Sequence, residues 1–169
     1  MKPAKTWEEL REYIDAAINL APGNIVAPRG KRTIEVCNVD LCVDPNIDVT
    51  GLPKFDREFA DMRLRVVRDK IHFSLNEAIK LLKEDPYTRR AYVLEPDYHP
   101  YNVPCVLLYQ FLIRQDKLEM IVYMRSSDFI NVLPLDIYVF QNIMNDVRKA
   151  LKVEEGAIHI HIGSLHRYV

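Results

Sequence analysis

Residues 157–162, AIHIHI, alternate strictly between apolar side chains and histidine. Successive side chains of a β-strand point to opposite faces, so this pattern predicts a strand with isoleucines on a buried face and His159 and His161 on the other. A half-buried strand requires a sheet and a second layer that covers it. The two histidines have a spacing found in metal sites, but the sequence places no third ligand beside them, which favours a solvated strand face.

The remaining segments supply helices and further strands for such a sheet. Capping boxes at Thr6 and Ser74, each with a glutamate three residues later, open helices that stop before the next proline. A third helix starts near Pro134, with Gly156 just beyond its end. Strands are predicted at residues 33–43, 91–95, 105–113 and 118–124, the last two joined as an antiparallel hairpin, with a loop at 44–54. This order predicts an α+β or α/β sheet in a single domain spanning residues 1–169.

The charge balance excludes several kinds of partner. The chain of 169 residues has 23 basic and 24 acidic side chains and a net charge of −1, so no global field draws it to nucleic acid or to an anionic membrane. No stretch approaches the roughly 18 apolar residues of a membrane-spanning helix, and the N-terminus has no apolar signal region. The three cysteines cannot all pair and have no CxxC spacing, so a reducing cytoplasm and no metal are expected.

Two arginine sites have the chemistry to bind a phosphate. One is the adjacent pair Arg89 and Arg90, and the other is Arg125 followed by Ser126 at the end of an apolar strand. Guanidinium groups bind phosphate oxygens at two points, and a neighbouring hydroxyl adds a short donor. The alternative for each arginine, considered singly, is a solvated surface charge.

Cys105 follows a proline at the start of a predicted strand. By itself this position fits an inert core thiol as well as a nucleophile, because free cysteine is among the most buried residue types. Cys37 and Cys42 have no polar or basic context and are expected in the core. Near the C-terminus, His166 and Tyr168 could donate hydrogen bonds to a sugar hydroxyl.

Four segments taken together resemble, in order, the motifs of thymidylate synthase: DPYTRR (85–90), VPCVLLYQF (103–111), RSSDFINVLPLD (125–136) and GSLHRY (163–168). The resemblance covers residues 75–168 and extends weakly to APRGKRTIEV (27–36). The short form is most similar to the archaeal, methanogen-type synthases, and dCMP hydroxymethylase shares the scaffold. The resemblance implies an α+β fold with a mixed, mostly antiparallel sheet and packed helices, and a homodimer that forms through the sheet.

The resemblance also implies a role for each candidate residue. Cys105 would add to C6 of a pyrimidine nucleoside monophosphate, so that C5 can attack a one-carbon donor. That donor would be a reduced pterin of the methylenetetrahydrofolate or tetrahydromethanopterin type. The phosphate would be held by Arg29, Arg125 and Ser126, joined by Arg89 and Arg90 from a second subunit, while His166 and Tyr168 would bind the ribose and Asp128 would lie near the base and the pterin.

Asp136 occupies the position of the family's base-reading asparagine. An asparagine amide pairs with O4 and N3–H of uracil, whereas an aspartate that shares a proton with N3 suits cytosine. The hydroxymethylase also has aspartate here, so a cytosine nucleotide is favoured, with dUMP, the thymidylate synthase substrate, as the alternative. A different interpretation is that Asp136 only caps the long helix, since it lies close to the positive N-terminus.

Departures from the family bear on the cofactor. The chain is much shorter between Pro45 and Leu75, and the family's folate-stacking tryptophan has no match there. The active-site glutamate of the family has a candidate counterpart in Glu58, and the C-terminal tail that closes over the cofactor is expected to be absent after Val169. An alternative from another functional class is a nucleotide-binding protein that keeps the phosphate and base sites with lost or reduced catalysis.

Overall fold

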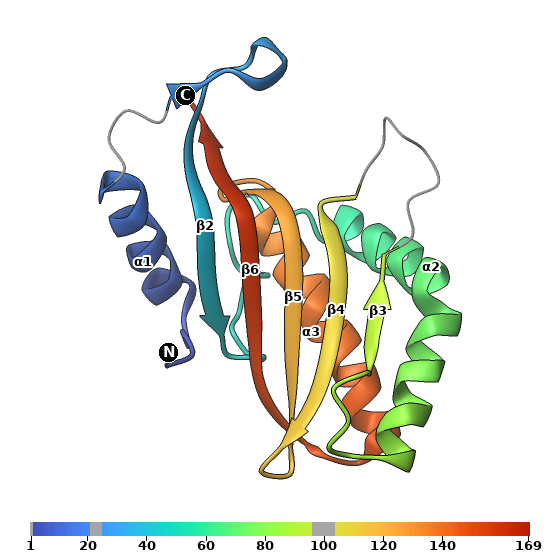
Figure 1. Ribbon diagram of the computed structural model, residues 1–169. Coiled ribbons are helices and arrows are strands. Elements are labelled where there is room, and N and C mark those ends of the chain that lie inside the picture. The colour runs from blue at the N-terminus through green and yellow to red at the C-terminus, as the bar shows by residue number, and fades with distance from the viewer. Residues whose placement is uncertain (1, 21–24, 96–103) are drawn as a thin grey trace.

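The computed structural model describes residues 2–20, 25–95 and 104–169, apart from the side chain of Arg29. The described helices are α1 (Trp7–Leu20), α2 (Arg57–Glu84), α3 (Leu133–Leu151) and a short 3-10 helix (Pro28–Gly30). The described strands are β1 (Ile25–Val26), β2 (Thr33–Val43), β3 (Tyr92–Leu94), β4 (Val106–Arg114), β5 (Lys117–Asp128) and β6 (Glu154–Tyr168). They form one sheet in the order β1-β2-β6-β5-β4-β3 (Figure 1).

The sheet is mixed and mostly antiparallel. Only β5 and β6 run parallel among the described pairs, and α3 connects them, because two parallel strands require a long crossover. The predicted α+β fold class is therefore confirmed. The β4–β5 hairpin is confirmed as well: its turn residues Gln115 and Asp116 both have positive φ, at 51° and 60°, as in a type I′ turn.

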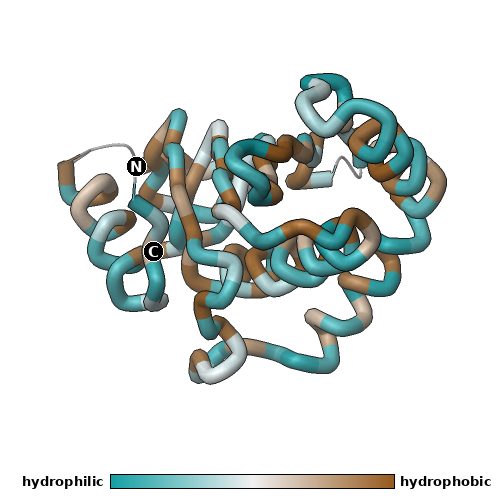
Figure 2. Tube along the Cα trace, turned by 90° about the horizontal axis from the view of Figure 1, so that it is seen from below, coloured by the Kyte–Doolittle hydropathy of each residue, from teal (hydrophilic) through white to brown (hydrophobic). Residues whose placement is uncertain are grey.

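The core lies between one face of the sheet and the helices. Met120 and Val122 of β5 and Ile158 and Ile160 of β6 are completely buried, as is Ile143 of α3. Each buried side chain of this size contributes roughly 1.5–3 kcal/mol by removing apolar surface from water. Figure 1 shows α3 behind the central strands and α2 behind β3 and β4, and in Figure 2 hydrophilic and hydrophobic residues alternate along the helices.

The opposite face of the sheet carries no helix among the described elements (Figure 1). It presents His159, His161 and Tyr123, the last 40% exposed. The Tyr123 and His161 rings stack with centroids 5.0 Å apart. The predicted alternation of the last strand is thus confirmed, with isoleucines facing the helices and histidines on the open face.

The prediction that a helix begins at Ser74 is wrong. Helix α2 starts 17 residues earlier, where the side chain of Asp56 accepts a hydrogen bond of 2.9 Å from the amide of Phe59. Ser74 lies inside the helix and its hydroxyl donates to the carbonyl of Ile71 at 3.1 Å. The helix continues through the capping-box sequence because its buried apolar residues lie both before Ser74, as Leu64 and Ile71 do, and after it, as Leu82 does. Packing of this face against the core stabilises the helix more than the local capping signal does.

Three smaller predictions also need correction. Helix α3 ends at Leu151 and is capped by Lys152, which has a left-handed φ of 57°, so Gly156 does not mark its end but belongs to β6. Strand β6 continues past residue 162 to Tyr168, and it pairs with β2 from Ile158 to Tyr168. Cys37 is exposed rather than part of the core, whereas Cys42 is buried. The capping box of α1 is confirmed, since Thr6 Oγ1 accepts a hydrogen bond from the Glu9 amide at 3.2 Å.

Within the described ranges, none of the helices is long and apolar enough to cross a membrane.

Candidate active-site cavity

A cavity of about 570 Å³ lies at the end of the sheet where β5 and β6 finish and β2 begins. Six side chains that the sequence predicted to share a site line it together. They are Cys105, Arg125, Ser126, Asp128, His166 and Tyr168. The remaining lining comes from Pro28, Thr33, Glu35, Ser127, Val132 and Ser164. Residues far apart in sequence meet here because β5, β6 and β2 are neighbours in the sheet.

Cys105 stands immediately before β4, and its thiol is half-buried. Its Sγ lies 4.0 Å from Ser126 Oγ. Arg125 Nη1 donates to the same hydroxyl oxygen at 3.0 Å, and Arg125 Nε donates to the carbonyl of Pro104 at 3.1 Å. The guanidinium group is therefore held beside the segment that carries the thiol, which gives this part of the cavity a positive charge next to a potential nucleophile.

The side of the cavity formed by β2 and β6 is polar. His166 and Tyr168 lie on the same face of β6, with ring centroids 5.7 Å apart in an edge-to-face arrangement. Ser164 donates a hydrogen bond to Glu35 of β2, its partner strand. Hydroxyl, imidazole and carboxylate groups along one edge can make several hydrogen bonds to a ligand that carries hydroxyls.

Asp128 organises the turn between β5 and α3. Its Oδ1 accepts from the amides of Ile130 and Asn131 at 3.0 and 3.2 Å, and its Oδ2 accepts from Asn131 Nδ2 at 2.7 Å. The carboxylate is thus engaged in shaping the loop while the residue lines the cavity. This arrangement holds the start of α3 against the end of β5.

Asp136 is almost fully buried, with a side chain 1% exposed, and does not line the cavity. It forms an ion pair with Arg63 of α2 and accepts from Ser127 Oγ at 3.4 Å. Burial raises the pKa of Asp136 from 3.8 to about 6, although the nearby Arg63 charge opposes the rise. Asp136 lies in the first turn of α3, but its carboxylate bonds are to these two side chains, which argues against a role limited to helix capping.

The structure places three other predicted site residues outside this cavity. Arg89 and Arg90 are exposed at the end of β3 where Tyr92 pairs with Gln110, five residues along β4 from Cys105. Glu58 is exposed in the first turn of α2, where a carboxylate interacts favourably with the helix dipole. Arg29 follows the cavity residue Pro28 in the 3-10 helix, and its side chain lies outside the described part of the chain. The roles assigned to these four residues remain predictions.

A second hollow, of about 370 Å³, lies on the other side of the loop that Asp128 organises. Its apolar lining includes Trp7 and Phe129, whose rings stack with centroids 5.7 Å apart. Arg11 and Lys54 also line it. A flat aromatic ring with an anionic tail fits such a combination of stacked rings and cations.

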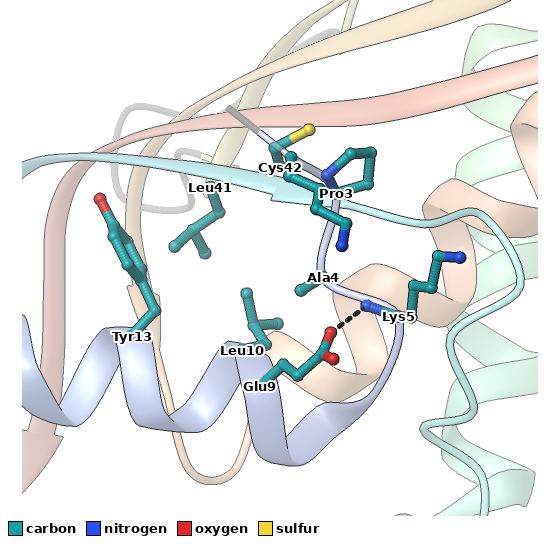
Figure 3. Close-up of a pocket in the computed structure, with 9 residues that line it drawn as sticks. Pro3, Ala4, Lys5, Glu9, Leu10, Tyr13, Leu41 and Cys42 are labelled. Atoms are coloured by element: carbon teal, nitrogen blue, oxygen red, sulfur yellow. Dashed lines mark hydrogen bonds between the residues drawn. The ribbon is translucent and has the colours of Figure 1, made fainter.

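A third hollow, of about 220 Å³, lies between the start of α1 and the end of β2 that carries Leu41 and Cys42 (Figure 3). It shares no lining residue with the cavity of Cys105. Lys5 there donates its backbone amide to Glu9 at 2.7 Å. The thiol that lines it belongs to Cys42, and burial raises its pKa, which makes it a poor nucleophile. Cys105 therefore has the more favourable setting for thiol chemistry.

No cluster of potential metal ligands occurs among the residues that the structure describes. His159 bonds to Glu119 Oε2 at 3.1 Å, and His161 is hydrogen-bonded to Asp40. Each histidine of the predicted strand face therefore has a carboxylate partner, and the two do not converge with a third ligand.

Several cavity residues were missed from the sequence. Thr33 and Glu35 could have been found from their two-residue spacing on β2, which puts both side chains on one face. Ser127 lies within the RSSD motif next to residues that were chosen. The ion pair between Arg63 and Asp136 has no sequence signal, because 73 residues separate them.

The fold and cavity define a class of α+β protein in which a thiol, a guanidinium group and hydroxyls face one ligand-sized space. Residues 54–169, more than half of the chain, match the family model described as thymidylate synthase, so the chain belongs to the thymidylate synthase family.

Individual relatives agree with this assignment. The chain is 33% identical over 94 residues to a "Putative thymidylate synthase" of Methanosarcina mazei, a match covering 53% of this chain and 43% of that protein. It is 27% identical over 125 residues to the thymidylate synthase of Mycoplasma genitalium, covering 68% of this chain and 43% of that protein. The chain thus spans about half the length of the curated relatives it matches.

Proposed function

We propose that this protein transfers a one-carbon unit to C5 of a pyrimidine nucleoside monophosphate. The observation that carries the proposal is the shared cavity of Cys105, Arg125, Ser126 and His166, which come from three separate parts of the chain. Family membership supports the same reaction class. The Mycoplasma relative is named "Thymidylate synthase" and the Methanosarcina relative "Putative thymidylate synthase".

Cys105 supplies the nucleophile in this proposal. Its thiolate adds to C6 of the ring, forming an S–C6 bond and moving the electron pair of the C5–C6 double bond onto C5 and the substituent at C4. C5 would form a bond to the methylene carbon of the donor as the bond from that carbon to a donor nitrogen breaks, and C5 would lose its proton. A hydride from the reduced pterin would complete a methyl group, and water would complete a hydroxymethyl group. Elimination of the thiolate restores the C5–C6 double bond. The Arg125 guanidinium, anchored beside Cys105 through Ser126 and the Pro104 carbonyl, places a positive charge next to the nucleophile.

The other cavity residues bind the nucleotide. Arg125 and Ser126 hold the phosphate together with Arg29, and His166 and Tyr168 hold the ribose. Their positions on two neighbouring strands, with Ser126 paired to Ser164 and Asp128 to His166, set the spacing between the phosphate and sugar subsites. Glu58 remains a candidate for proton handling, although it is exposed in this structure.

A reduced pterin, of the folate or methanopterin type, supplies the one-carbon unit in this reaction. The residues of the second hollow fit it: Trp7, which stacks on the buried Phe129, offers a surface for a flat ring, and Arg11 and Lys54 suit an anionic tail. Asp128 and Val132 line the nucleotide cavity, while Phe129 and its two successors line the hollow, so one loop separates the two binding regions.

The base of the nucleotide is cytosine or uracil, and the residue that bears on the choice is Asp136. Asp136 favours cytosine if it carries a proton to share with N3, and dUMP is the alternative. A pKa of about 6 means that Asp136 is mostly ionised at neutral pH, which weakens the cytosine interpretation under those conditions. The ion pair with Arg63 also favours the ionised form of Asp136.

A homodimer that forms through the open face of the sheet completes the proposal. That face carries partly exposed Tyr123 with Ile121 beside the strand histidines and lacks a covering helix in the described residues. Arg89 and Arg90 are exposed and lie outside the cavity of Cys105, and in this proposal they bind the phosphate of the second subunit.

Release of tritium from [5-³H]dUMP or [5-³H]dCMP tests the proposal. Addition of Cys105 to C6 makes the C5 proton exchangeable, so release above background is expected with at least one nucleotide, and it should increase when a reduced pterin donor is added. Binding without any release would instead support the alternative of a nucleotide-binding protein with lost catalysis.

A further inference from the structure

The carboxylate of Asp136 lies between a cation and a cavity hydroxyl. Arg63 of α2 donates to Oδ1, and Ser127 of β5 donates to Oδ2 at 3.4 Å. Ser127 is 1% exposed but lines the cavity, whereas Asp136 does not. The hydroxyl of Ser127 therefore connects the buried ion pair to the wall that a ligand would touch.

Two charged groups act on Asp136, and they come from different parts of the chain. Arg63 is the cation in contact with it, and Glu95, which follows β3, is the anion near both. Tyr109 of β4 donates its hydroxyl to Glu95 at 2.9 Å. An unpaired buried carboxylate would take up a proton, because burial disfavours the charged form. Arg63 opposes this and keeps Asp136 an ionised acceptor.

The ionisation of Asp136 determines how Ser127 can behave. An ionised carboxylate only accepts hydrogen bonds, so Ser127 must donate its proton to Asp136 and turn its lone pairs elsewhere. A protonated Asp136 can itself donate to Ser127, whose hydroxyl proton is then free to point into the cavity. Uracil presents an N3–H donor, whereas cytosine presents an N3 acceptor.

We infer that Arg63 is a positioning residue that determines base preference: by holding Asp136 as an acceptor, it makes Ser127 an acceptor toward the cavity and favours a base with N3–H over one with a bare N3. This inference rests on the proposed function, since it concerns the base of the same nucleotide. Asp136 considered alone favours cytosine. With Arg63 and Ser127 included, the expected base is uracil.

The test measures dissociation constants for dUMP and dCMP by calorimetry at pH 7.5. Wild type is expected to bind dUMP about tenfold more tightly than dCMP, because a single mispaired polar group in a buried site costs about that much affinity. Arg63→Gln is expected to shift the ratio about tenfold toward dCMP, and Arg63→Lys should retain the wild-type preference because it keeps the charge. Ser127→Ala should abolish the discrimination, and it keeps the inference testable if Arg63→Gln does not fold.

Arg68→Gln is the matched control. Arg68 also links α2 to α3, through hydrogen bonds of 2.8 and 3.0 Å to Asp146, but it does not touch Asp136. Its dUMP to dCMP ratio should equal that of wild type. An unchanged ratio in Arg63→Gln or Ser127→Ala, or a wild-type preference for dCMP, overturns the inference. If the inference fails in one of these ways but wild type still releases tritium from C5, only the inference is overturned and the proposed function is kept. A wild type that binds neither nucleotide overturns both.

Discussion

The Sγ atom of Cys105 lies 4.0 Å from the Oγ of Ser126, and Arg125 donates to that same oxygen at 3.0 Å. One hydroxyl thus links the candidate nucleophile to the candidate phosphate ligand. The amide of Arg125 also donates to the carbonyl of Cys105 at 2.8 Å, so backbone pairing fixes the distance between them. A ligand whose phosphate binds to Arg125 is therefore positioned with its other groups at a fixed distance from the Cys105 thiol.

Replacing Cys105 by serine should abolish C5 tritium release while leaving nucleotide affinity nearly unchanged. The hydroxyl fills a similar volume but is a far weaker nucleophile, so the exchange rate should fall by on the order of 10³-fold or more. Cys37→Ser, at an exposed position on β2, is the control and should exchange at the wild-type rate. Residual exchange close to wild type in Cys105→Ser would exclude the thiol from the chemistry.

Replacing Arg125 by alanine should weaken nucleotide binding by roughly 1.5–3 kcal/mol, the contribution of a hydrogen bond to a charged group. The affinity for the corresponding nucleoside should change little, because it has no phosphate to lose. Calorimetric titration with both ligands gives the comparison. An equal loss for nucleotide and nucleoside would assign Arg125 a structural role through its contacts with Ser126 and Pro104.

Gly163→Ala should disturb the site through the backbone. A Cβ at Gly163 would lie 2.9 Å from the carbonyl oxygen of Arg125, so β5 and β6 would have to separate beside the cavity. We expect a loss of roughly 1–3 kcal/mol in unfolding free energy, as for other overpacked positions, together with weaker nucleotide binding. Gly51→Ala is the control, since its nearest contact would be an ordinary 3.5 Å. Unchanged stability and affinity in Gly163→Ala would contradict this close approach.

The raised pKa of Asp136 predicts a pH-dependent stability. A carboxyl group whose pKa rises from 3.8 to about 6 on folding binds its proton more tightly in the native state. Its stabilising contribution is complete below about pH 4 and is lost as the pH rises through 6, by about 3 kcal/mol at most. The unfolding free energy of wild type minus that of Asp136→Asn should therefore decrease between pH 4 and 7. Urea denaturation at four pH values measures it, and parallel curves would contradict it.

The open face of the sheet gives a prediction for assembly. Tyr123→Asp introduces a charge at a position that is 40% exposed on this face. We expect it to shift a dimer to monomers in analytical ultracentrifugation and to weaken nucleotide binding, because Arg89 and Arg90 would no longer reach the neighbouring site. The folded monomer should keep its helical circular dichroism. A wild type that sediments as a monomer would contradict the proposed dimer.

Local patterns predicted much of the fold correctly. The β-branched run at 33–43 predicted β2 with its observed bounds, and the alternation around His159 predicted the buried and open faces of β6. These patterns work because burial on one face imposes a period of two on a strand. The start of α2 was missed because the Ser74 capping box is a local signal, and the packing of Leu64 and Ile71 outweighs it.

By itself, the sequence determined the family and the chemistry-bearing motifs, because these reside in contiguous strings such as RSSD at 125–128. The tertiary structure alone decided which residues share the cavity, and that Arg63 contacts Asp136 across 73 residues of chain. The physical reason is that the charge of a buried carboxyl depends on the groups packed against it. Those groups come from other elements, and only folding brings them together.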